Sequence, residues 1–242
     1  FAHGEFLTFG ALTMATLSSK PISEDMQGQL GAPVLSGLGL PWALSVVLAV
    51  LSTGLLAALI ERWVLRPLVG RPVFVTIILT LFIGLLLRTF MSLGWGNQPI
   101  PLVTPWDPLG GVFILGAFLR YDALAPIVAG VVGVVGFYGI LNYTRLGVAM
   151  RACAVDQEAS LAMGIPVGKV FGATWFLSGA IAGLGGVFVG SASQLGVDPH
   201  LGFIAFKAFP AVIVGGLESP LGAVIAGLAM GVMEVFCSAY VN

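Results

Sequence analysis

The residues that could carry out catalysis in this sequence are few and poorly spaced. His3 and His200 are the only histidines, and neither belongs to a ligand pattern such as H-E-x-x-H. Gly164, Gly168 and Lys169 come nearest to a phosphate-binding loop, but the two glycines are one residue too close and no hydroxyl residue follows the lysine. We therefore predict no catalytic residue, no metal site and no cofactor bound by this chain.

Four charged residues lie inside or beside long apolar stretches, where a charge is costly and marks a functional site or an inward-facing pair. They are Glu5, Arg88, Lys207 and Glu234. Arg88 is close to the expected outer end of its stretch, so we expect its side chain to snorkel to the lipid headgroups. For Glu234, a hydrogen bond to a neighbouring helix and contact with a transported solute both stay open.

A second group of candidates surrounds an interrupted apolar stretch. Lys207 is either a pore-facing charge or an interfacial lysine, and the Gly215–Gly216 pair would let the backbone approach a solute or a neighbouring helix. Glu5, Lys207, Gly215, Gly216 and Glu234 are our candidates for a translocation path.

The segment 144–170 is long for a simple connection between apolar stretches. Its middle, from Arg151 to Met163, has no helix breaker, and apolar residues recur there at spacings of three and four, which predicts one amphipathic helix. Gly164 would end this helix, and Pro166 prevents its continuation. Such a helix could dock in a groove of a soluble partner. A surface helix on the lipid headgroups is the alternative.

The composition defines the surroundings of these residues. The chain is 58% hydrophobic and 9% charged, where soluble domains carry about 25% charge. Its net charge is −1, so it has no basic surface for a nucleic acid. Cys153 and Cys237 have no metal-ligand spacing and cannot form a disulfide framework. The sequence therefore indicates a polytopic membrane protein in a lipid bilayer.

Membrane-spanning helices of about 20 apolar residues account for most of the chain. Five segments qualify: Trp42–Ile60, Val73–Leu93, Ala123–Tyr143, Gly172–Ser193 and Leu221–Tyr240. Phe6–Leu17 and Phe203–Val214 are shorter, and we expect the latter to be kinked or half-length because Pro210 lies inside it. The prediction is an all-α transmembrane bundle with about six or seven membrane segments.

Lysine and arginine predict the orientation, because cytoplasmic loops hold the excess of both. Loop 61–72 holds Arg62, Arg66 and Arg71, and loop 144–171 holds Arg145, Arg151 and Lys169. Both loops should be cytoplasmic, whereas loops 20–40 and 94–122 should face outward. Small residues four apart, such as Gly179 with Gly183 and Gly186 with Gly190, predict close helix packing.

Several motifs resemble one transporter family. Glu158, Ala159, Ser160 and Gly164 resemble the EAA---G signature of ABC importer permeases, with serine in place of the second alanine. Segments 1–5 (FAHGE), 61–67 (ERWVLRP), 145–165 and 208–233 resemble, in the family's order, the LivH-type permease of the branched-chain amino acid ABC importer. Because family members have further helices at both ends, we expect this chain to be a fragment lacking both.

The resemblance implies a single transmembrane permease domain over 1–242 that works with a second permease subunit, two cytosolic ATPases and a periplasmic or extracellular binding protein. ATP would be used by the partner subunits. Segment 151–164 would be the coupling helix within the cytoplasmic loop 144–171. Arg151, Asp156 and Glu158 would make polar contacts with the ATPase, and Ala159 and Gly164 would allow close approach.

We therefore expect a permease subunit in the bacterial cytoplasmic membrane that moves branched-chain amino acids or a related small polar solute such as urea or an amide. The alternatives are a secondary transporter driven by an ion gradient, with Glu5 or Glu234 in a proton or sodium relay, and an integral membrane enzyme. Few intramembrane acids disfavour the first alternative, and the missing catalytic groups disfavour the second.

Overall fold

The computed structural model describes residues 2–20, 37–68, 72–107, 110–114, 116–192, 196–216 and 219–240. Arg71, Ser193 and most of the expected outward loop 20–40 lie outside these residues. The chain forms two compact units, Phe1–Leu201 and Gly202–Asn242, which are treated separately below.

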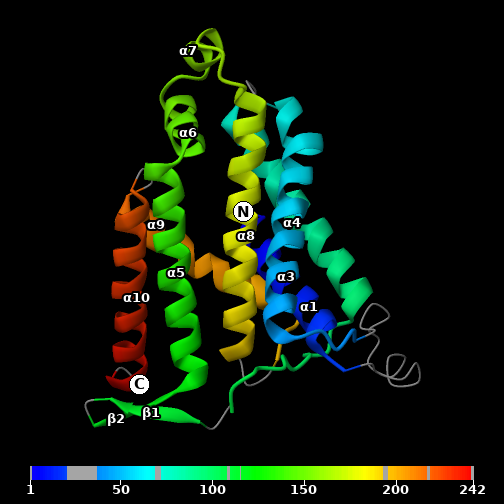
Figure 1. Cartoon of the computed structure of the whole chain (residues 1–242), viewed down its shortest axis with the longest axis vertical. Helices are drawn as coiled ribbons and strands as arrows, with labels where there is room; N and C mark the ends of the chain where they lie inside the picture. The colour runs from blue at the N-terminus through cyan, green and yellow to red at the C-terminus, as the bar shows by residue number, and fades with distance from the viewer. Residues whose placement is uncertain are drawn as a thin grey trace. The chain divides into compact units, whose positions relative to one another are not determined.

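Five helices in the described part are long and apolar enough to cross a bilayer. They are α3 (Trp42–Ile60), α4 (Val73–Trp95), α5 (Tyr121–Tyr143), α8 (Val167–Ala192) and α10 (Pro220–Tyr240). These helices confirm the predicted spans and the all-α polytopic fold. α1 (His3–Ser18) is shorter and packs in the first unit against α3 and α8 (Figure 1).

Small residues of α8 let its backbone approach α1 and α3. A β-carbon at Gly179 would lie 2.4 Å from Cβ of Ala57 on α3, and one at Gly183 would lie 2.8 Å from Oγ1 of Thr53. On the α1 side, a β-carbon at Gly186 would come within 1.8 Å of the Leu7 carbonyl oxygen. The predicted small-residue packing of α8 is thus confirmed, and it gives van der Waals contact where hydrophobic association is weak.

Apolar side chains of α1 fill the remaining space in the first unit. Phe6 and Leu12 are fully buried, the first with residues of α3 and α4, the second with Met91 of α4. The Trp95 indole donates a hydrogen bond to Thr16 Oγ1 at 2.7 Å. α1 is therefore an interior helix of its unit, consistent with its ten buried residues.

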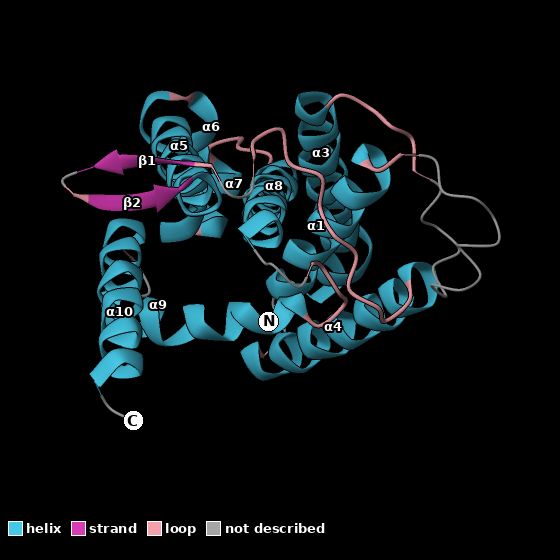
Figure 2. Cartoon of the chain, turned by 90° about the horizontal axis from the view of Figure 1, so that it is seen from below, coloured by secondary structure: helices cyan, strands magenta, loops and turns pink. Residues whose placement is uncertain are grey.

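A β-hairpin follows α4, and the sequence prediction did not contain it. β1 (Gly111–Ile114) pairs antiparallel with β2 (Ala117–Arg120), with Val112 opposite Leu119 and Phe113 opposite Phe118 (Figure 2). Gly116, with φ +85°, lies in the connection, where the left-handed conformation favours glycine. Between α4 and α5, the apolar residues of 111–114 and 117–120 thus form a strand pair rich in β-branched and aromatic residues.

The second unit contains a broken helix and a long one. A 3-10 segment, Leu201–Lys207, leads into α9 (Ala208–Gly215), so the expected half-length helix is present. Its break precedes Pro210, which lies in the first turn of α9, where the missing N–H leaves no helical bond unmade. A β-carbon at Gly215 would lie 2.3 Å from the Gly222 carbonyl of α10, so Gly215 serves helix packing here.

Candidate functional site

The predicted coupling helix is two helices. α6 (Arg145–Val155) and α7 (Gln157–Ala162) are separated by Asp156, whose backbone is extended at φ −153° and ψ 115°. Asp156 Oδ1 accepts hydrogen bonds from the backbone N–H groups of Glu158, at 2.8 Å, and Ala159, at 3.0 Å. The prediction of one continuous helix from Arg151 to Gly164 was therefore wrong, because an aspartate caps a new helix more favourably than it continues an old one.

Gly164 ends α7 in a left-handed conformation. Its φ is +82°, its N–H donates to the Leu161 carbonyl, and the Ile165 N–H donates to the Ser160 carbonyl, each at 3.0 Å. This pair of hydrogen bonds is the Schellman arrangement, which favours glycine at its left-handed position. A β-carbon there would meet no atom of this chain within 4 Å. Within the chain, then, the glycine is required by the backbone conformation rather than by space.

The apolar residues at spacings of three and four, Ala152, Val155, Ala159 and Ala162, do not form the face that α6 and α7 bury. Cys153 and Ser160 are buried, and Cys153 packs in an apolar cluster with Val167 and Val170 at the start of α8. Val155, on the expected apolar face, is 89% exposed. Leu161 and Met163 of the α7 segment are exposed as well.

Arg151 belongs to α6 and turns back toward α5. Its Nη1 donates to the Leu141 carbonyl and lies 3.4 Å from Asn142 Oδ1, so it binds the carboxyl end of α5. The close α5–α6 turn also depends on Gly147, where a β-carbon would lie 2.1 Å from the same Leu141 carbonyl oxygen. Both contacts fix α6 on α5, and Figure 1 shows α7 beyond it at the tip of the unit.

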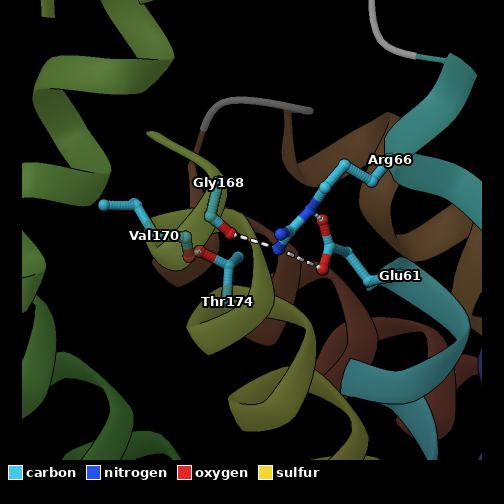
Figure 3. Close-up of polar contacts among 5 residues, drawn as sticks. All are labelled: Glu61, Arg66, Gly168, Val170 and Thr174. Carbon is cyan, nitrogen blue, oxygen red and sulfur yellow. Dashed lines mark hydrogen bonds and ion pairs between the residues drawn. The ribbon is translucent and has the colours of Figure 1, made fainter. Parts of the chain in front are cut away.

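A three-part polar contact joins the end of α3 to the start of α8 (Figure 3). The Arg66 guanidinium donates to both carboxylate oxygens of Glu61, Nε to Oε1 at 3.1 Å and Nη2 to Oε2 at 3.0 Å. Nη2 also donates to the Gly168 carbonyl at 2.5 Å. Glu61 is only 3% exposed, so its charge is compensated inside the protein. The two predicted cytoplasmic loops thus lie at the same end of the unit.

The local cause of this contact is a π-helical turn over Glu61–Leu65. Residues five apart come together in such a turn, which places Arg66 over Glu61. Gly172, whose β-carbon would lie 3.4 Å from Glu61 Oε2, leaves room for the carboxylate. Sequence reasoning counted Arg66 as a loop charge. The five-residue spacing in ERWVLRP is the signal that could have indicated the pair.

Arg88 does not snorkel, contrary to our expectation. Its Nη2 donates to Glu5 Oε1, and the two side chains are 20% and 7% exposed, respectively. Nearby on α1, His3 Nε2 lies 2.7 Å from Ser178 Oγ of α8. An arginine side chain extends to the headgroups when no partner lies closer. Here Glu5 of α1 is that partner, although it is distant in the sequence.

The remaining candidates of the translocation path lie in the second unit. Lys207 Nζ pairs with Glu234 Oε1, and the two side chains are 65% and 60% exposed. Gly216 has φ +94° and ends α9, so its backbone requires glycine. The structure therefore brings Lys207 and Glu234 together, while Glu5 pairs within the first unit.

The whole chain, residues 1–242, matches the family described as branched-chain amino acid transport system / permease component. The chain belongs to this family. LivH of Salmonella typhimurium, a high-affinity branched-chain amino acid transport system permease protein, is 28% identical across 100% of this chain and 77% of its own length. BraD of Pseudomonas aeruginosa, with the same description, is 28% identical across 98% and 75%. No solved structure matches the chain.

A third relative broadens the comparison. The L-arabinose ABC transporter permease protein AraH of Azospirillum brasilense is 32% identical over 52% of this chain and 35% of its own length. The chain is thus an integral membrane permease component. In this permease, the motif residues Glu158 and Ala159 are exposed on α7, Ser160 is the buried residue of the same helix, and Gly164 follows its C-terminal end.

Proposed function

We propose that this permease is the transmembrane subunit of an ATP-driven importer for branched-chain amino acids or a related small polar solute. It works with a second permease subunit, two cytosolic ATPases and an external binding protein, and the ATPases alone use ATP. The whole-chain family match and the branched-chain amino acid transport described for LivH and BraD support this proposal. The name of AraH supports the ABC class.

The observation that carries the docking assignment is the geometry of α7. This helix is capped at both ends, by the Asp156 side chain and by the Schellman turn at Gly164, so its conformation is fixed before a partner arrives. Its apolar side chains Leu161 and Met163 are exposed, which suits a helix that inserts into a hydrophobic groove. Glu158 lies exposed in the first turn, where it would contact the rim of that groove. Arg151 is exposed on α6 and binds α5 through Nη1, so its other N–H groups would make the predicted contact with the ATPase.

Force applied to α7 would reach α8 through α6 and the short link 163–166. Ser160 is the buried residue of α7, and its Oγ donates to the Asp156 carbonyl at 2.7 Å. The Cys153–Val167–Val170 cluster links α6 to α8, and Arg66 links α8 to α3 through the Gly168 carbonyl. Because packed helices move as rigid elements, displacement of α7 would tilt α8 against α1 and α3.

Transport assays test the driving force. Proteoliposomes that hold the permease, its ATPases and the binding protein should take up L-leucine only when ATP is present on the ATPase side. Uptake driven by a proton or sodium gradient without the ATPases would instead support a secondary transporter. Absence of ATP-dependent uptake of leucine, isoleucine and valine would reject the proposed substrate class.

Thiol labelling tests the orientation in the cytoplasmic membrane. A Glu158→Cys substitution in a Cys153→Ser, Cys237→Ser background places one exposed thiol on α7. An impermeant maleimide should label it in inverted membrane vesicles and leave it unlabelled in intact cells. Labelling in intact cells would put α7 on the outer side and remove the docking proposal.

Docking itself is tested by combining Glu158→Lys with Gly164→Arg. The reversed charge and the lost left-handed turn should prevent α7 from fitting its groove, so the ATPases should no longer co-purify while membrane insertion is retained. Lys169→Gln, an exposed change on the same side of the unit, serves as the control. Undiminished co-purification of the double variant would reject the assignment.

A further inference from the structure

A polar cavity opens beside α4 in the first unit. It has a volume of about 280 Å³ and is lined by Arg88, Thr89, Ser92, Asn97, Pro199 and His200. It therefore combines the carboxyl-terminal part of α4 with the segment that follows α8. Its volume is close to the lower end of the range for small-molecule sites, which is about 300 Å³.

The position of this cavity is unusual for a membrane helix. Arg88 lies seven residues before the end of α4, about 10 Å along the helix axis. The surrounding face of α4 is apolar, with Leu85 and Phe90 exposed. Polar groups at membrane depth face a water-filled or protein-covered space, because lipid cannot satisfy them. The cavity beside α4 is thus a protein-lined space that can hold water or a polar solute next to Arg88.

The lining also includes Leu93 and Pro199, and its polar side chains are mainly hydrogen-bond donors, which indicates the charge of the ligand. Arg88 contributes a guanidinium with five N–H donors, and His200 adds an imidazole. The Ser92 hydroxyl donates to Asn97 Oδ1, so the amide nitrogen of Asn97 presents its donors to another acceptor. The residues that line the cavity include no aspartate or glutamate. Such a lining fits an anionic acceptor, above all a carboxylate.

Glu5 orients the Arg88 guanidinium. Its carboxylate holds Arg88 Nη2 from the α1 side, and Gly84 of α4 leaves room for it, since a β-carbon there would lie 3.7 Å from Glu5 Cγ. A guanidinium anchored on one edge loses less conformational freedom when it binds a second carboxylate. Glu5 is thus a positioning residue for Arg88.

A larger apolar groove in the same unit makes a useful contrast. It measures about 590 Å³ and is lined by residues of α3, α5 and α8, including Trp42, Val128 and Phe188. A lipid chain satisfies such a surface completely, so the groove identifies no particular ligand. The cavity beside α4, by comparison, holds a guanidinium, an imidazole and an amide, which water or a polar group can satisfy.

We propose that the cavity beside Arg88 is a subsite of the import path that binds the α-carboxylate of the transported amino acid. This inference rests on the proposed function. Arg88 binds the carboxylate, Asn97 and His200 supply further polar contacts, Ser92 orients the Asn97 amide, and Glu5 orients Arg88.

The test exchanges the two charges. The double variant Glu5→Arg, Arg88→Glu keeps opposite charges at both positions, so a merely structural ion pair would be retained, but it places a carboxylate where the cavity needs a cation. In proteoliposomes with the ATPases and the binding protein, uptake of radiolabelled L-leucine should fall about tenfold or more, since a charged hydrogen bond is lost. ATPase activity stimulated by the binding protein should persist. The matched control exchanges Arg120 and Asp122, another ion pair of this unit outside the cavity.

A second pair of variants covers the case in which the exchanged protein does not assemble. Asn97→Ala removes a polar contact, and Ser92→Ala removes the hydroxyl that orients the Asn97 amide. Each should raise the KM for leucine uptake roughly two- to tenfold with little change in ATPase activity. Wild-type uptake by the charge-exchanged variant, or an unchanged KM in both alanine variants, would overturn the subsite. If the wild-type complex shows no ATP-dependent leucine uptake, the proposed function itself fails.

Discussion

The two ion pairs formed by charges of apolar segments differ in what surrounds them. Glu5 and Arg88, in the first unit, are 7% and 20% exposed and come from α1 and α4. Lys207 and Glu234, in the second unit, are 65% and 60% exposed on the surface of this chain. The first pair is enclosed by the fold of the chain itself. The surroundings of the second pair are not supplied by this chain and depend on what contacts the second unit in the membrane.

This difference shows that chemical type alone does not determine the role of an intramembrane charge. An enclosed charge that loses its partner is left uncompensated, because little solvent reaches it, and the folded state is destabilised. An exposed charge can find water or another group after the same loss, so the pair contributes little to stability. Four substitutions follow, from the largest expected effect to the smallest. The first and the last compare the two ion pairs directly.

Glu5→Gln should have the largest effect. It leaves the partly buried Arg88 guanidinium without its counter-charge and should lower the free energy of unfolding by up to about 3–5 kcal/mol. Unfolding in mixed detergent micelles, followed by tryptophan fluorescence, measures the change. The charge exchange Glu5→Arg, Arg88→Glu should restore a large part of it. Wild-type stability of Glu5→Gln would show that the pair is not enclosed.

Arg66→Leu should have an intermediate effect. It leaves the Glu61 carboxylate, 3% exposed, without its two donors and removes the bond to the Gly168 carbonyl. Arg66 is itself partly exposed, so we expect a loss of about 2 kcal/mol. Arg66→Lys keeps the charge but not the forked geometry, and it should recover less than half of the loss. Full recovery by lysine would mean that only the charge matters.

Gly164→Ala should have a smaller effect than either of these substitutions. Gly164 is exposed. Its left-handed backbone should make alanine cost about 1–2 kcal/mol in the closure of α7. The readout is the affinity for the ATPase subunits in detergent, which should fall several-fold. Gly164→Asn should be milder, because asparagine tolerates this conformation. Equal affinities for glycine, alanine and asparagine would contradict the Schellman assignment.

Glu234→Gln should have the smallest effect, a change in the free energy of unfolding of about 1 kcal/mol or less. The same unfolding measurement as for Glu5→Gln gives a direct comparison of the two glutamates. A loss as large as that of Glu5→Gln would show that the second pair is covered in the folded protein.

The membrane spans could be read from the sequence because their signal is local. A run of about 20 apolar residues partitions into a bilayer whatever its neighbours do. For the same reason the small-residue face of α8 was predictable, since Gly179 and Gly183 lie on one face by helical geometry alone. The motif around Glu158 and Gly164 located α7 to within a few residues.

The interior of the candidate site was less predictable. Helix periodicity favoured one helix through Asp156. The side chain of that residue instead accepts hydrogen bonds from two backbone N–H groups and caps a new helix. The Glu61–Arg66 pair depends on a π-helical turn, a local departure that periodicity arguments do not contain. In the hairpin, two short strands supply each other's hydrogen bonds, which a search for spans does not detect.

The sequence by itself determined that this protein is embedded in a bilayer, which segments span it, and which family the protein belongs to. These properties follow from composition, from the length of apolar runs and from short motifs. Only the tertiary structure decided that Arg88 meets Glu5, that Arg66 reaches the Gly168 carbonyl, and that polar groups gather beside α4. These contacts depend on the depth and rotation of helices that are far apart in the chain, and no local pattern fixes either quantity.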